Sequence, residues 1–256
     1  MNSTLSETYN MMLSFLKNHP FAVEAYFESS VVLTFAIPKA QLEHLIPECL
    51  TLDTFQDEWG FVAIAMVQTT GLRPKGFPKI LGSNFFLTGY RIFVKYNDHR
   101  NKRLRGLYIL KSKTDSPRMK ILGNVFTHYN YSTIDLHKSQ SGNTQLIRSE
   151  KSGLEVRYQN GMDASLPKNS PFENWKEARR YAGPLPFTFT YNASKKEVLI
   201  IEGVRSNWKP TPINILDYKS PFLESYNFKD YVLANAFEIT NIPYYWKPGK
   251  IEKWQQ

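Results

Sequence analysis

Residues 120–131, with the sequence KILGNVFTHYNY, concentrate side chains that can form hydrogen bonds. Six of them follow Gly123: Asn124, Thr127, His128, Tyr129, Asn130 and Tyr131. Buried polar side chains lower stability unless each finds a partner. The segment therefore predicts either an internally satisfied network or a ligand site, in which His128 is the candidate acid or base.

Metal-ligand patterns are weak in this chain. His128, Asp135 and His137 would form a two-histidine, one-carboxylate site if the chain folded back on itself. A histidine with an ordinary hydrogen-bond partner is the more frequent arrangement. We therefore predict no metal and no other cofactor.

Two lysines offer a nucleophile. Lys111 and Lys113 alternate with Ile109 on one face of the strand-like run YILKSKTD, where mutual repulsion would activate them for imine formation. The alternative, which we favour, is that this face is the outer, solvated one. Glu202 is either a buried acid or, as we favour, lies where its strand meets solvent. No G-x-S-x-G, G-x-G-x-x-G or G-x-x-x-x-G-K-[ST] motif occurs.

Composition indicates a soluble globular protein. The 256 residues are 42% hydrophobic, which allows a sizeable core in one large domain or two small ones. The single cysteine, Cys49, excludes an internal disulfide, fits a reducing compartment and is predicted to be packed. The first basic residue is Lys17, so no secretory signal is visible, and the longest apolar run, 61–67, is too short to span a bilayer. These features predict a cytoplasmic protein without a membrane partner.

The net charge of +9 raises the question of an anionic partner. Residues 98–120 hold eight lysines and arginines against two aspartates. Such a segment attracts nucleic acid or a small carboxylate. It contains no recognisable nucleic-acid motif and no interleaved aromatic residues, so we favour a solvated turn and predict no nucleic-acid partner.

Periodicity and turn residues predict the following elements. A capped N-terminal helix over 3–17 ends at His19-Pro20, and a second helix over 171–182 has Ser170 as its N-cap and Glu173 in a capping box. A short helix is expected over 38–46 and an irregular loop over 71–82. Strands are expected over 31–37, 61–69, 84–96, 106–113, 144–148, 154–159, 186–191 and 197–204. This pattern predicts one α+β domain built on a large antiparallel sheet or barrel.

Four segments in series resemble the acetoacetate decarboxylase-like superfamily, and more closely a group of uncharacterised bacterial proteins within it. They are LEHLIPECLTLDTFQDEWGFVAIAMV (42–67), FFLTGYRIFVKY (85–96), RGLYILKSKTD (105–115) and ILGNVFTHYNY (121–131). The resemblance implies a single domain over residues 1–256. It would be a mainly antiparallel β-barrel with an internal cavity and few peripheral helices, one of them N-terminal over 1–18.

The resemblance carries over few functional residues. True decarboxylases have two adjacent lysines in a G-[YF]-P-K-K-like run, one of which forms the imine. That run aligns with 123–127, which contains no lysine. The family's glutamate aligns with Leu87 and the asparagine of the uncharacterised group with Gly89, so only Arg91 is retained. The resemblance places Leu87, Gly89, Arg91 and Phe93 on the interior face of the barrel.

An interior arginine requires either a protein carboxylate or an anionic ligand. The first hypothesis is a pocket for a small anionic or carboxylate ligand, without the imine-forming lysine pair. Its ligand-binding residues would be Arg91, Asn124, His128, Tyr129 and Tyr131. The alternative is a lyase or decarboxylase-like enzyme that acts on a small keto or carboxylic acid through Arg91 and His128. A third possibility is that Arg91 pairs with Glu202 in a filled barrel. A homo-oligomer is compatible with all three.

Overall fold

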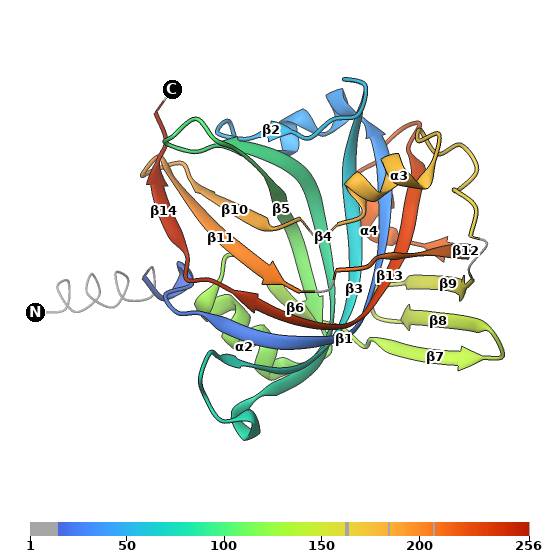
Figure 1. Ribbon diagram of the computed structural model, residues 1–256, viewed down its shortest axis with the longest axis horizontal. Coiled ribbons are helices and arrows are strands. Elements are labelled where there is room, and N and C mark those ends of the chain that lie inside the picture. Colours follow the sequence, from blue (N-terminus) through green and yellow to red (C-terminus); the bar gives the residue numbers. More distant parts are fainter. Residues whose placement is uncertain (1–14, 162–163, 184, 207, 256) are drawn as a thin grey trace, which may run out of the picture.

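The computed structural model describes residues 15–161, 164–183, 185–206 and 208–255, and the fold is mostly β (Figure 1). The predicted N-terminal helix lies almost wholly outside these residues; of its span only 15–17 are described, and they are helical. Within the described ranges, no helix has the length and apolar character needed to cross a membrane.

Fourteen strands form one mixed sheet. Their bounds are β1 Val23–Pro38, β2 Thr51–Leu52, β3 Trp59–Pro74, β4 Ser83–Asn97, β5 Arg103–Thr114, β6 Tyr131–Thr133, β7 His137–Ser141, β8 Thr144–Ser149, β9 Leu154–Asn160, β10 Phe187–Asn192, β11 Glu197–Arg205, β12 Thr211–Lys219, β13 Val232–Trp246 and β14 Lys250–Lys253. β5 pairs in parallel with β10 and with β6, and the other strand pairs are antiparallel. The expected mainly antiparallel sheet is therefore confirmed, with two parallel pairs that the sequence did not indicate.

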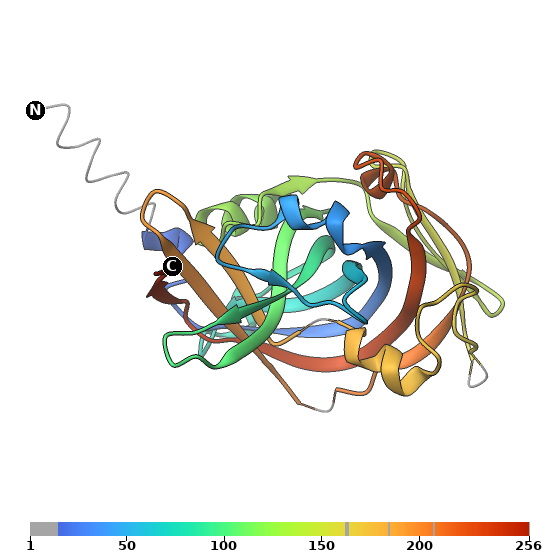
Figure 2. The ribbon, with the colours of Figure 1, turned by 90° about the horizontal axis from the view of Figure 1, so that it is seen from above.

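Seven of the strands pair in a path that returns to its start. β1 pairs with β3, and the pairing continues through β4, β5, β10 and β11. β11 then pairs over Gly203–Arg205 with β13, which pairs with β1. Figure 2 shows these strands curving round on themselves. The path gives the sheet an inner and an outer face.

Side-chain size, more than polarity, distinguishes the two faces. On β3 the inner face carries Ala63 and Ala65, while the outer face carries Ile64 and Met66, and all four are buried. Because successive side chains of a strand point to opposite faces, this alternation leaves space inside and fills the outside. A strand buried on both faces reads as a continuous apolar run, which is how the sequence predicted it.

An aromatic cluster fills the inner face near the end of the ring that carries α3 (Trp175–Ala178). The ring of Tyr181 lies 4.2 Å from that of Phe61, and Phe172 lies 5.6 Å from Phe61. The Tyr181 hydroxyl donates to the Thr54 carbonyl at 2.9 Å. Phe61, Phe93, Phe172 and Tyr181 are all buried, so aromatic side chains fill the inner face here.

The outer face of β1, β3 and β4 packs against β8, β9, β12 and α4 (Pro221–Glu224). The Phe222 ring stacks on Tyr90 at 3.8 Å. The carboxylate of buried Glu238 on β13 fastens this layer, because it accepts hydrogen bonds from Ser29, Lys138, Tyr158 and Asn160. These bonds join β1, β7, β9 and β13.

The short helices differ from their predictions. Residues 38–46 form two 3₁₀ turns, η1 (Lys39–Gln41) and η2 (Glu43–Leu45). In the second predicted helix only α3 and η4 (Arg179–Tyr181) are helical. Asn174 is the cap, accepting from Glu177 N. The Ser170 cap is wrong because residues 171–174 are not helical, although Ser170 Oγ accepts from Phe172 N at 3.2 Å. The remaining helical elements are α2 (Pro117–Phe126), which we did not predict, and η3 (Lys79–Leu81) in the predicted loop.

Substituting Glu238→Ala should destabilise the fold by about 3–5 kcal/mol, because it leaves Lys138 and three polar side chains without their shared acceptor in a buried setting. Urea denaturation followed by circular dichroism measures the change. Glu155→Ala removes an exposed pair with Arg157 on the same layer and should cost at most about 1 kcal/mol. Equal losses in both variants would contradict the assigned role of Glu238.

Candidate binding cavity

A cavity of about 310 Å³ lies on the inner face, lined by the seven strands, by α2 and by the segment that precedes β1. Most of its walls are apolar; examples are Val67, Leu72, Phe85, Leu107 and Ile201. Among the described lining residues there is no aspartate, glutamate or lysine, and Arg73 and Arg91 carry the fixed charges. The cavity is therefore an apolar space with a positive potential.

Arg91 enters the cavity from β4, where it lies opposite Ala63 of β3 and Ile109 of β5. A Cβ added to Gly89 would lie 2.8 Å from Arg91 Nε and 2.9 Å from an Nη atom. The guanidinium therefore lies over Gly89. The neighbouring inner positions on adjacent strands, Ala65 and Ser112, are also small. A row of small residues thus makes room for one large cation.

The charge of Arg91 has no protein counter-ion among the described residues, and its buried Nε has no hydrogen-bond partner there. Arg73, by contrast, forms an ion pair with Glu24 at 2.6 Å and donates to two backbone carbonyls. Glu202 lies on the outer side of β11 and pairs with Lys247 at 2.8 Å. The suggested Arg91–Glu202 pair is therefore wrong.

Segment 120–131 forms the end of α2 and a turn that directs two tyrosines inward. Ser116 caps α2 by accepting from Met119 N at 3.2 Å, with Pro117 following. The Tyr131 ring lies against Gly123, where an added Cβ would come within van der Waals overlap of the ring. The Asn124 amide donates to the Tyr131 carbonyl at 2.9 Å and accepts from its N–H at 2.7 Å. Asn124 therefore clamps the backbone that carries Tyr131.

Tyr129 and Tyr131 both line the cavity. The Tyr129 hydroxyl lies 2.7 Å from the Thr188 hydroxyl. Burial raises the pKa of Tyr129 to about 12 and also raises that of Tyr131, although nearby Arg91 opposes both shifts. Both phenols are therefore neutral at pH 7, so neither supplies the negative charge that Arg91 lacks.

Three further polar groups face the cavity, and sequence reasoning did not select them. Ser30 Oγ, Thr69 Oγ1 and His19 Nε2 are buried without a hydrogen-bond partner in the described part of the chain. Each hydroxyl lies in a short polar run, 28–30 or 68–70, at the end of an apolar run, so no sequence signal distinguished it from its neighbours. His19 has a left-handed backbone (φ 54°), and its carbonyl accepts from Gly249 N at 2.8 Å.

The family model for DUF2071, described as "Uncharacterized conserved protein", matches residues 24–243. The chain belongs to the DUF2071 family. No curated protein matches this DUF2071 chain in sequence.

Solved structures share its fold. Acetoacetate decarboxylase from Legionella pneumophila subsp. pneumophila str. Philadelphia 1 is 10% identical, with 91% of this chain and 88% of that chain covered and a TM-score of 0.61. An acetoacetate decarboxylase-like enzyme from Sphingomonas wittichii RW1 is 10% identical, with 94% of each chain covered and a TM-score of 0.55. The enduracididine biosynthesis enzyme MppR, complexed with pyruvate, is 6% identical, with 91% of this chain and 90% of that chain covered and a TM-score of 0.52. The predicted resemblance to the acetoacetate decarboxylase-like superfamily is confirmed, and at these identities the solved structures establish the fold alone.

The five predicted ligand residues of this DUF2071 protein separate into two groups. Arg91, Tyr129 and Tyr131 line the cavity, whereas Asn124 and His128 are not among its lining residues. The Asn124 amide is occupied by the Tyr131 backbone. Burial, with a smaller contribution from Lys17, lowers the pKa of His128. All five residues of 127–131 can form hydrogen bonds, so the sequence did not reveal which of these side chains the turn directs inward.

The two strand lysines lie on the outer side of β5, as favoured from the sequence. A β-bulge places Tyr90 opposite Lys111 but Arg91 opposite Ile109. Ile109 and Ser112 therefore line the cavity, and Lys113 Nζ lies 5.6 Å from the outer-face Tyr90 ring. The expected sharing of one face by Ile109 and the lysines is wrong, because the extra residue shifts the alternation. Cys49 is buried, as expected, and burial raises its thiol pKa to about 12.

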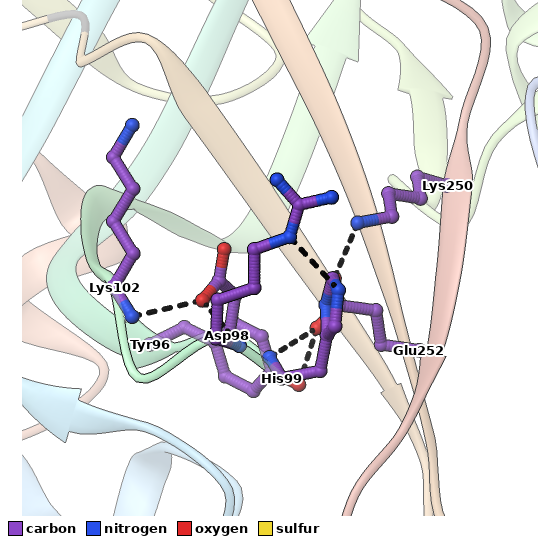
Figure 3. Close-up of polar contacts among 7 residues, drawn as sticks. Tyr96, Asp98, His99, Lys102, Lys250 and Glu252 are labelled. Atoms are coloured by element: carbon purple, nitrogen blue, oxygen red, sulfur yellow. Dashed lines mark hydrogen bonds and ion pairs between the residues drawn. The ribbon is translucent and has the colours of Figure 1, made fainter.

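One group of potential metal ligands occurs in the described residues: Asp98, His99 and Glu252. Figure 3 shows that Glu252 is instead held by hydrogen bonds from His99 Nδ1 at 2.8 Å and Lys250 Nζ at 2.6 Å. Burial raises the pKa of Glu252, but the bonds from Lys250 and His99 outweigh burial and bring it to about 2. We assign the cluster to fastening the β4–β5 turn onto β14. His128, Asp135 and His137 do not form such a group, and Asp135 accepts from Ser149 at 2.7 Å.

His19 should make stability depend on pH. Burial lowers its pKa to about 4, so the folded state stays neutral while the unfolded state takes up a proton near pH 6.5. Stability should therefore fall as pH decreases from 6.5 towards 4, by up to about 3 kcal/mol at the lower limit. Asparagine tolerates the left-handed backbone, so His19→Asn should flatten urea-unfolding stabilities between pH 7 and pH 5. The exposed-site control His44→Asn should behave as the wild type, and an unchanged slope in His19→Asn would rule out this linkage.

Proposed function

We propose that this protein binds a small carboxylic acid with an apolar body, and that Arg91 binds its carboxylate. The main observation in support is that the Arg91 guanidinium lies inside an apolar cavity and has no protein counter-ion among the described residues. An unpaired interior cation is costly, and a carboxylate with two oxygens matches the guanidinium geometry. The neutral tyrosines do not balance the charge of Arg91, whereas an anionic ligand would balance it.

The strand register supports an elongated ligand. The guanidinium lies at the level of Gly89 and Ala65, whereas Ser30 lies opposite Val67, two residues further along β3. At about 3.3 Å per residue, Ser30 lies about 7 Å from the guanidinium level, and Thr69 lies about 13 Å from it. The cavity volume of about 310 Å³ lies at the lower end of the range of small-molecule sites. Octanoate, a small acid with an apolar chain, serves as the probe.

The alternative of a decarboxylase-like enzyme has less support. Its proposed acid or base, His128, is not among the lining residues, and none of the described lining residues is a lysine. MppR, a protein of similar fold, is complexed with pyruvate, a small organic acid, and this is compatible with binding of an acid here. The proposal of ligand binding requires no covalent step.

We further propose that the ring of seven paired strands acts as a closed barrel around this cavity, within one domain that spans the chain. The return pairing of β11 with β13 and the continuous inner cluster of buried residues support this arrangement. Limited proteolysis should release no stable half of the molecule.

Replacing Arg91 should abolish the preference for an acid. Isothermal titration of octanoate against Arg91→Met should show affinity reduced about 10-fold to 100-fold, since a hydrogen bond to a charged group contributes about 1.5–3 kcal/mol. Octanol, which lacks the charge, should bind both forms similarly. Arg103→Met, an exposed change on β5, should leave octanoate binding intact. Undiminished octanoate binding by Arg91→Met would eliminate the proposed carboxylate site.

Adding one methyl group beneath the guanidinium should have a related effect. In Gly89→Ala the new Cβ would displace the Arg91 side chain, and we expect several-fold weaker octanoate binding in the same titration. Gly161→Ala is the matched control, because an added Cβ there meets nothing within 4 Å. Equal octanoate affinity in the Gly89 and Gly161 variants would show that the position of the guanidinium does not matter.

A further inference from the structure

The cavity wall reaches the surface at Leu122, beside a patch of exposed apolar side chains. Five of the ten large hydrophobic residues that are exposed in the described chain gather here: Phe77, Ile80, Leu81, Ile121 and Leu122, which we call the mouth patch. Ile80 is 91% exposed and Ile121 is 64% exposed. Apolar residues so fully exposed and so close together mark an interaction surface more often than isolated ones do.

The mouth patch comes from two segments that lie side by side. The loop with η3 supplies three of its residues and α2 supplies two, and both elements lie at the bottom of Figure 1. Arg118 Nη2 on α2 donates to the Leu81 carbonyl at 3.5 Å. Leu72 and Ser83, which flank the loop, and Leu122 of α2 also line the cavity. The patch is therefore continuous with the cavity wall.

Positive charge surrounds these apolar side chains. Lys75, Lys79, Arg118 and Lys120 are exposed, and residues 71–82 and 117–126 contain no acid. Of the neighbouring acids, Glu24 pairs with Arg73, whereas Asp115 accepts from Phe86 N at 2.8 Å and keeps its charge. The mouth patch thus combines apolar side chains with a border of four basic residues that is net cationic.

This combination favours an anionic lipid surface over a second copy of the chain. In a two-fold symmetric dimer the patch would face itself and bring the same cations together. A bilayer with anionic head groups offers phosphates to the lysines and arginine, and an apolar layer to Ile80 and Ile121. We propose that the mouth patch docks this protein peripherally on anionic membranes, with the cavity opening towards the lipid. The sequence predicted no membrane partner because no run could span a bilayer, and peripheral contact requires no span.

Docking of this kind goes beyond the proposed function and does not depend on it. It would place the opening where apolar acids accumulate, since such acids partition into bilayers. Vesicle binding and octanoate titration measure the two proposals separately, so each can fail while the other stands.

Co-flotation of the purified protein with vesicles tests the docking surface. We expect binding to vesicles of phosphatidylcholine with phosphatidylglycerol, and at least about tenfold weaker binding to phosphatidylcholine alone. The double variant Ile80→Ser, Ile121→Ser should lose about tenfold or more, because both isoleucines would no longer bury apolar area in the bilayer. Lys79→Glu should lose about tenfold through its change of two charges.

Matched controls lie away from the mouth patch. Ile251→Ser on β14 removes another exposed isoleucine, and Lys229→Glu makes the same charge change elsewhere; both should keep wild-type binding. All of these positions are exposed, and circular dichroism verifies folding. The proposal is overturned if the wild type does not float with anionic vesicles, or if the controls lose as much as the mouth variants. It is also overturned if the mouth substitutions convert a dimer to a monomer in gel filtration without changing flotation.

Discussion

The charge of Arg91 inside an apolar enclosure is the constraint on which the rest of the structure depends. A guanidinium in such a place needs room, an oriented backbone and compensation for its lost hydration. The row of small inner residues at Ala65, Gly89 and Ser112 supplies the room. The compensation is not supplied by described acidic residues, so the proposed ligand completes an electrostatic arrangement that the protein leaves open.

Two other cations of the fold show how a protein acid can solve the same problem. Arg105 pairs with buried Asp53 at 2.6 Å, and Lys138 with Glu238 at 3.2 Å. In both cases the acid is deeply buried and the basic side chain is partly exposed. Arg91 differs from both, since it lines the cavity and has no acidic partner among the described residues. This contrast separates structural ion pairs from a site for binding.

Sequence patterns predicted eight of the strands, because their apolar runs and turn residues are local signals, but they missed β7, β12, β13 and β14. The family resemblance indicated the interior position of Arg91. The patterns failed where contacts between residues distant in the sequence determine the local structure. α2 follows a Ser-Pro start, but its glycine belongs to contact with Tyr131 rather than to a turn. The bulge at residue 110 is one extra residue in the register, and no composition signal marks it. His19 could not be selected, because its neighbours in the fold include residues as distant in the sequence as Gly249, whose N–H donates to the His19 carbonyl.

The aromatic cluster around Phe61, Phe172 and Tyr181 has a kinetic consequence. In the barrel proposed above, this cluster would close the interior at one end, so that a ligand would enter and leave from the other. A new molecule then cannot push out the old one from behind, so exchange requires complete release first. The off-rate should therefore be independent of the concentration of competing ligand, and the residues around the opening should control residence time more strongly than those at the closed end.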